Sequence, residues 1–223
     1  MQKPILRTPS DKEISEELMK IRSELIENTD KIVTLIAIKR NILGNLKPIC
    51  YIVNEICDCL ILKKECAAIT LTNHLFESSL KLFLTICKAS ERIIDKSDGF
   101  EDMYKEEIRF FQKNKMKENL KYALNKNLIT EEEYKDLFNL MIEYRDNISH
   151  DSSNSFVRGA KTVVLSYDFA TKESKEKIVG VLGNPWLNQQ AKESFMRKNA
   201  YEYFTHIYMY IMKWDMRIQE SKT

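Results

Sequence analysis

The sequence of 223 residues predicts an all-α fold: a helical bundle of about five to six helices, with a small β-hairpin or irregular flap near residues 160–185. Two observations support this prediction. Glycine and proline number only five and four, roughly a third of their usual share, which argues against a turn-rich β-sandwich or barrel. Apolar residues also recur at helical spacing along most of the chain.

The first helical stretch is predicted over residues 10–46. Ser10 and Glu13 have the spacing of a capping box, which marks a helix start. The apolar residues that follow are three, four or seven positions apart, which places them on one helical stripe: Ile14, Leu18, Ile21, Leu25, Ile32, Leu35, Ile42 and Leu46. The pattern fits either one long helix or two helices broken at residues 28–30. Gly44 is typical of a C-cap, and Pro48 suits the first turn of a second helix near residues 49–60.

Four more helices are predicted, over residues 65–97, 102–125, 130–149 and 187–219. Gly99 ends the first of these, and a capping box of Thr130 and Glu133 opens the third. Two β-branched runs, 162–167 and 177–182, flank a polar loop at 171–176 and predict the hairpin or flap. We therefore expect an N-terminal helical extension, residues 1–63, and a helical bundle, residues 64–223, that includes a flap at 156–186.

Charge and composition limit the partners. The net charge is only +2, so nucleic-acid binding would need a local basic patch. The few glycines cannot form a phosphate-binding glycine loop. Apolar runs are far shorter than the roughly 20 residues of a membrane-spanning helix, and the first residues do not resemble a signal peptide. We expect a cytoplasmic protein with no membrane partner.

The five cysteines indicate reduced thiols, because their number is odd and no secretion signal precedes them. Cys57 and Cys59, together with Cys50 and Cys66, could be interpreted as metal ligands. However, they lack the paired spacing of zinc sites, and unpaired cysteines are commonly buried as small apolar side chains. We expect no metal and no cofactor.

One short stretch, residues 145–150, could carry chemistry. Asp146 and His150 are four apart and share one face of a helix, so the carboxylate can orient the imidazole and raise its pKa. Arg145 has the planar guanidinium that suits phosphate. Arg145 and His150 are five apart, about 140° around an ideal helix, and converge only if the helix bends or frays before His150. The alternative is that Arg145 pairs with a glutamate and His150 simply ends a helix.

Residues 145–150 resemble the R-x4-6-H motif of the HEPN superfamily, in which Asn, Asp or His follows the arginine. The resemblance covers about residues 65–219 and adds Asn147 and Ser149 as supporting positions. It implies an all-helical domain. Many members are metal-independent ribonucleases of toxin–antitoxin, abortive-infection and CRISPR-linked defence systems. An antitoxin or another defence protein is therefore an expected partner. A subset has a tyrosine two residues after the histidine, where this chain has Ser152, which speaks against regulation by modification there.

Some HEPN members also carry an E-x3-K-R motif on an earlier helix. Glu77 and Lys81 supply E-x3-K, whereas Leu82 replaces the final basic residue. A glutamate four residues before a lysine is also an ordinary ion pair on a helix surface. The sequence leaves both interpretations open.

Metal-free RNA cleavage needs a base for the 2′-OH, an acid for the 5′-oxygen and positive charge near the phosphorane. The family resemblance implies a composite site at a symmetric homodimer interface. We hypothesise that His150 is the base or acid, Arg145 stabilises the phosphorane and Asp146 orients the histidine. Two alternatives remain: an inactive HEPN-like module that binds RNA, nucleotide or a protein partner, and a plain helical interaction protein whose motif is coincidental.

Two further patterns concern surfaces. Basic residues recur every four positions along the predicted helix 102–125: Arg109, Lys113, Lys117 and Lys121. They could bind the phosphates of RNA or form an ordinary solvated helix face. The last helix is rich in aromatic residues, most of which are expected in the core, with a surplus available for a dimer interface. His206 on that helix is interpreted as a core or interface histidine rather than a catalyst.

Overall fold

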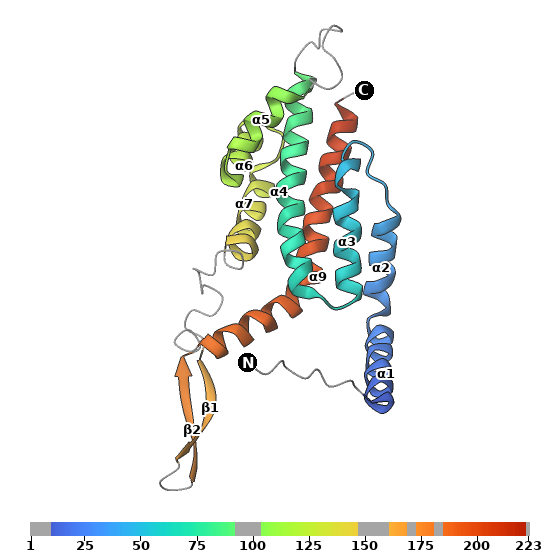
Figure 1. Cartoon of the computed structure of the whole chain (residues 1–223). Helices are drawn as coiled ribbons and strands as arrows, with labels where there is room; N and C mark the ends of the chain where they lie inside the picture. The colour runs from blue at the N-terminus through green and yellow to red at the C-terminus, as the bar shows by residue number, and fades with distance from the viewer. Residues whose placement is uncertain (1–9, 92–103, 147–160, 169–172, 181–184, 222–223) are drawn as a thin grey trace, which may run out of the picture. The chain divides into compact units, whose positions relative to one another are not determined.

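The computed structural model describes residues 10–91, 104–146, 161–168, 173–180 and 185–221. The chain divides into two compact units, 1–41 and 42–223. The described residues form eight α-helices, one 3-10 helix, one π-helix and one two-stranded sheet (Figure 1). The all-α class is confirmed, but the predicted number of five to six helices is too low. Two of the predicted helices are each divided in two.

The first unit holds α1 (Asp11–Glu27) and α2 (Thr29–Arg40). The predicted capping box is present: the Glu13 backbone N–H donates to the Ser10 hydroxyl at 3.3 Å, and the Ser10 N–H donates to the Glu13 carboxylate at 2.7 Å. Asn28, with φ −109° and ψ 20°, separates the two helices. The predicted stretch 10–46 is therefore not one helix, and α2 ends at Arg40.

The second unit begins with a turn that α9 (Pro185–Glu220) holds in place. The Asp215 carboxylate of α9 accepts hydrogen bonds from the backbone N–H groups of Gly44, Asn45 and Leu46, at 2.9, 2.7 and 2.8 Å. The 3-10 helix η1 (Lys47–Ile49), with Pro48 in its first turn, leads into α3 (Cys50–Ile61).

The central pair of the bundle is α4 (Glu65–Ser90) and α9, which lie side by side (Figure 1). Their contact is largely apolar, and Phe83 stacks on the buried Trp214 with ring centroids 5.4 Å apart and planes 8° apart. Helix α3 also packs on α4, as do α5 and α6. The core therefore follows the length of α4. The predicted end of this helix, at residues 97–99, lies outside the described residues.

The predicted helix 102–125 is in fact two helices, α5 (Lys105–Lys113) and α6 (Met116–Asn125). Asn114 and Lys115 are extended, with ψ of 143° and 155°. The chain changes direction at these residues, and the Tyr122 ring of α6 meets the buried Phe111 ring of α5 at a centroid distance of 5.1 Å. This packing stabilises a break that neither glycine nor proline marks.

The predicted helix 130–149 begins as expected and then changes character. Thr130 and Glu133 form the predicted capping box at the start of α7 (Glu131–Leu140). From Met141 to Asp146 the chain is a π-helix, η2, whose hydrogen bonds join residues five apart instead of four. The regular α-helix therefore ends at Leu140, before the Arg145 motif.

The two strands are β1 (Lys161–Asp168) and β2 (Glu173–Gly180), paired antiparallel with Lys161 opposite Gly180 and Asp168 opposite Glu173. The second strand thus begins inside the stretch 171–176 that was predicted as a polar loop. Backbone pairing accounts for this extension, because the N–H and C=O groups of a strand need partners whether or not its side chains are polar.

The compact units divide after residue 41, whereas the sequence-based boundary is at residue 63. The difference is α3, which packs on α4 and belongs to the second unit. Within the described residues, none of the helices has the length and apolar composition needed to span a membrane.

Candidate functional site

One face of α4 carries three polar residues at successive turns: Asn73, Glu77 and Lys81. Residues four apart on a helix lie above one another, so they form a column. Its first two members, Asn73 and Glu77, contact the π-helix η2. Asn73 is buried, and the side chains of Glu77 and Lys81 are 30% and 25% exposed. The column therefore begins inside the core and ends where solvent and a ligand can reach it.

Glu77 joins the two patterns that the sequence analysis singled out. Its carboxylate accepts a hydrogen bond from Lys81 Nζ at 2.7 Å and one from Arg145 Nη2 at 3.2 Å. Burial alone would raise the pKa of Glu77, but the bonds and charges of Lys81 and Arg145 outweigh it and lower the pKa. The carboxylate is therefore ionised at neutral pH. One negative charge stands against two positive charges, so these three groups carry a net charge of +1.

The backbone beside Arg145 is fixed by Asn73 and Tyr203. The Tyr203 hydroxyl donates to Asn73 Oδ1 at 2.7 Å, and Asn73 Nδ2 donates to the carbonyl of Tyr144 at 3.4 Å. Tyr144 itself stacks on Tyr203. Burial, followed by the charges of Glu143 and Glu202, raises the pKa of Tyr144 to about 12. Both phenols are thus neutral, and their role here is to position the helix turn that carries Arg145.

The remaining predicted catalytic residues follow directly on this turn. Asp146 is the last residue of the π-helix. Asn147, Ser149 and His150 lie outside the described residues. The regular α-helix already ends at Leu140, and the path from Arg145 to His150 lies mostly outside the described residues.

Lys81 also lines a groove of about 480 Å³ between α4, α5 and the turn before η1. Its walls combine aliphatic side chains with groups that can form hydrogen bonds, among them Asn45, Ser78, Tyr104 and Gln112. Such a lining suits a small amphipathic ligand such as a nucleoside. The groove therefore offers space next to the positive cluster of Lys81 and Arg145.

The basic row is exposed but is not a single helical face. Arg109 and Lys113 belong to α5, whereas Lys117 and Lys121 belong to α6. The extended residues Asn114 and Lys115 interrupt the four-residue spacing, so the prediction of one unbroken row is wrong. Lys117 Nζ lies 5.2 Å from the centre of the Phe138 ring on α7.

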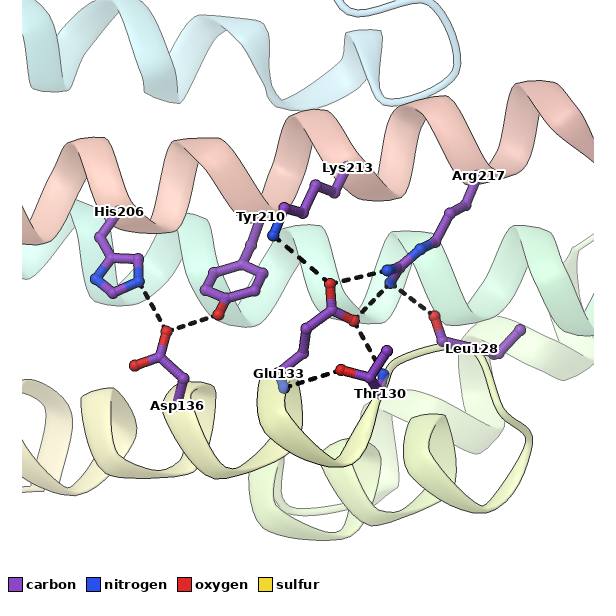
Figure 2. Close-up of polar contacts among 8 residues, drawn as sticks. All are labelled: Leu128, Thr130, Glu133, Asp136, His206, Tyr210, Lys213 and Arg217. Atoms are coloured by element: carbon purple, nitrogen blue, oxygen red, sulfur yellow. Dashed lines mark hydrogen bonds and ion pairs between the residues drawn. The ribbon is translucent and has the colours of Figure 1, made fainter.

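A second polar cluster joins α7 to α9 (Figure 2). Arg217 donates to both carboxylate oxygens of Glu133, at 2.9 and 2.8 Å, and to the carbonyl of Leu128 at 2.9 Å. Lys213 Nζ adds a charge 3.8 Å from Glu133. Burial opposes ionisation of Glu133, but the Arg217 and Thr130 hydrogen bonds and the nearby positive charges lower its pKa. Glu133 thus takes part both in this partly buried ion pair and in the capping box of α7.

His206 takes part in the same contact between α7 and α9. Asp136 Oδ2 lies 2.7 Å from His206 Nε2 and accepts a bond from the Tyr210 hydroxyl at 2.6 Å (Figure 2). The His206 side chain is 37% exposed, so it lies at the edge of a helix contact and not in the core. Most of the aromatic residues of α9 are buried, as predicted: Tyr203, Phe204, Tyr208, Tyr210 and Trp214.

Sequence reasoning missed Asn73, Tyr144 and Tyr203 as parts of the site. The sequence did contain a signal for Asn73: it is a polar residue on the apolar side of a long helix, one turn before Glu77. The tyrosines gave no such signal, since both fit an ordinary apolar pattern.

Among the described residues, no group of histidine, cysteine and acidic side chains has the arrangement of a metal site. Cys57 is buried, Cys66 is exposed, and Cys50, Cys59 and Cys87 are intermediate. The four cysteines considered as metal ligands thus differ in exposure, and they lie on two helices, α3 and α4. Comparison with known proteins finds no matching protein-family model, curated protein or solved structure.

Proposed function

We propose that this chain is a metal-independent endoribonuclease of HEPN type, which cleaves RNA by 2′-OH transesterification at a composite site between two copies. The observation that carries the proposal is the carboxylate of Glu77, which bonds to both Lys81 and Arg145. These residues come from two sequence patterns that resemble HEPN motifs and are 68 positions apart. The cluster has an excess positive charge, which favours a phosphodiester.

In this proposal Arg145 stabilises the phosphorane, because its planar, cationic guanidinium is partly exposed. His150 acts as base or acid, and Asp146 orients it, with Asn147 and Ser149 in support; these roles rest on the sequence resemblance. Two copies related by a two-fold axis would supply each group twice. The groove beside Lys81 would hold a nucleoside next to the scissile phosphate. We place this activity in phage defence or a toxin–antitoxin system in the cytoplasm.

A second candidate function is an inactive HEPN-like module that binds RNA, a nucleotide or a protein partner. The observation that favours it is the same ion pair, because an arginine held by a glutamate also serves a structural role. The two functions differ in whether RNA is bound only or is also cleaved.

The decisive experiment incubates the purified full-length chain with labelled RNA in the presence of EDTA. We expect fragments that end in 2′,3′-cyclic phosphate and 5′-hydroxyl groups. His150→Ala and Arg145→Ala should each reduce cleavage at least about a hundredfold. Lys135→Ala is the matched control, since Lys135 forms an exposed ion pair with Glu131 on α7. Unchanged cleavage by His150→Ala would overturn the proposal, whereas RNA binding without cleavage by the wild type would favour the inactive module.

The basic residues of α5 and α6 are tested by salt dependence. If they bind RNA phosphates, replacing Lys117 and Lys121 by glutamine should weaken the salt dependence of RNA binding. The plot of log K, the RNA association constant, against log salt concentration should become less steep by about 0.7 for each phosphate that is no longer neutralised. The same double change at Lys12 and Lys20 on α1 serves as a control of equal charge. An equal slope for both variants would assign the α6 lysines to an ordinary solvated face.

A further inference from the structure

Helix α1 leaves apolar residues in solvent. It spans 17 residues, and an isolated helix of about this length is only marginally stable in water. Yet Ile14 is 44% exposed and Leu18 is 61% exposed. An amphipathic helix with an open apolar side gains stability when a partner covers that side.

The spacing of the apolar positions indicates what kind of partner fits. Ile14, Leu18, Ile21 and Leu25 are separated by four, three and four residues, which places them at heptad positions d, a, d and a. This is the narrow seam of a coiled coil, with a period of 3.5 residues. The Ser10–Glu13 capping box fixes the start of the helix just before the seam, and Asn28 ends it just after the seam.

The charged residues beside the seam select the orientation. Glu17 falls at position g and Arg22 at position e, and both side chains are exposed. In a parallel, in-register pair, a g residue faces the e residue five positions later on the other chain. Glu17 of each copy would then face Arg22 of the other copy, twice in one dimer. In an antiparallel pair, g residues face each other, which would bring Glu17 towards the position of Glu24.

We propose that α1 is a dimerisation helix, which pairs with α1 of a second copy of this chain as a parallel, in-register, two-stranded coiled coil. The seam from Ile14 to Leu25 spans less than two heptads, so it would give a weak dimer by itself and a stronger one if another surface also contacts the partner. The inference goes beyond the proposed function and does not depend on it, because it concerns assembly whether or not RNA is cleaved.

A charge-swap series in the full-length chain tests this proposal by sedimentation equilibrium. Glu17→Arg would bring two arginines together at each of these contacts, and Arg22→Glu would bring two glutamates together. Each single variant should weaken the dimer about tenfold, since two attractive contacts become repulsive. The double variant should return to within about threefold of wild type. An equimolar mixture of the two single variants should form heterodimers.

Glu16→Arg is the matched control. Glu16 lies at the outward position f and pairs only weakly with Lys12 of the same helix, at 3.9 Å, so the same charge change there should leave the dimer constant within about twofold. Helix content by circular dichroism shows that each variant keeps α1 folded. A monomeric wild type at every concentration would overturn the proposal. So would a dimer that Glu17→Arg tightens, which is the antiparallel result, or single variants that the double variant does not rescue.

Discussion

Tyr144 lies flat against Tyr203: their ring centroids are 4.0 Å apart, and their planes differ by 5°. The stacked pair joins the π-helix η2 to α9, one residue before Arg145. Because the Tyr203 hydroxyl also donates to Asn73 of α4, three elements meet at this point. The position of Arg145 relative to Glu77 therefore depends on groups that do not themselves contact a ligand.

Tyr203→Phe should reduce the free energy of unfolding by about 1–2 kcal/mol. The phenylalanine ring can keep the stack on Tyr144, but Asn73 Oδ1 loses a hydrogen bond of 2.7 Å inside the core. Urea unfolding monitored by circular dichroism measures the change. Tyr51→Phe is the control, because Tyr51 is 61% exposed, and it should alter stability by less than about 0.5 kcal/mol. Equal effects of the two variants would contradict the assigned role of the hydroxyl.

Arg217→Lys should lower the free energy of unfolding by about 1–2 kcal/mol, and Arg217→Ala should lower it by about 3 kcal/mol. The alanine variant loses more because the Glu133 side chain is only 10% exposed and would be left without its main partner. Lysine keeps the charge but cannot donate to both carboxylate oxygens and to the Leu128 carbonyl as the planar guanidinium does. The unfolding free energies from urea titrations give the ranking. A lysine variant as stable as the wild type would show that only the charge matters. The exposed pair Lys135–Glu131 provides a control: Lys135→Ala should cost less than about 0.5 kcal/mol.

Local signals in the sequence predicted the helix starts well, whereas helix breaks that depend on packing were missed. Ser10–Glu13 and Thr130–Glu133 are capping boxes, whose partners lie three residues apart. The break at Asn114 lacks such a local signal. It is stabilised by Tyr122 returning against Phe111, a contact between side chains that apolar spacing alone does not reveal.

The candidate site shows the same limit. Spacing along one helix indicated that Glu77 and Lys81 could pair, because they are four apart. Their connection to Arg145 spans 68 positions and arises only when η2 packs on α4. Asn73 and Tyr203, which hold η2 there, are 130 positions apart, so no short motif could have linked them.

Cys87 should react slowly with iodoacetamide at pH 8. Burial, with a smaller effect of the Glu91 charge, raises its thiol pKa to about 11, so only about one thiol in a thousand is ionised at that pH. Cys66 is exposed and should be alkylated at least about tenfold faster. Mass spectrometry of the digested protein measures both rates, and labelling in urea is the control, in which the two should become similar. Equal rates in the native protein would contradict the partial burial and the raised thiol pKa of Cys87.

Glu77→Gln should destabilise the protein only where the wild-type carboxylate is ionised. The pKa of Glu77 is lowered from its ordinary value of 4.5, so the native state binds fewer protons than the unfolded chain as the pH falls below that value. Its contribution to stability is therefore fully present above about pH 5 and is lost as the pH falls through the lowered pKa. At pH 7 we expect the free energy of unfolding of Glu77→Gln to be about 1 kcal/mol below that of the wild type. The difference is modest because the carboxylate is partly exposed.

The measurement is the difference in unfolding free energy between wild type and Glu77→Gln, from urea titrations between pH 3 and pH 7. The difference should be constant down to about pH 5 and then decrease towards zero. Glu131→Gln, in an exposed ion pair with Lys135, is the control and should show less than about 0.5 kcal/mol throughout. A deficit that persists unchanged at pH 3 would mean that the charge of Glu77 is not what holds Lys81 and Arg145. The shape of the wild-type carboxylate, which glutamine does not reproduce fully, would then be the cause.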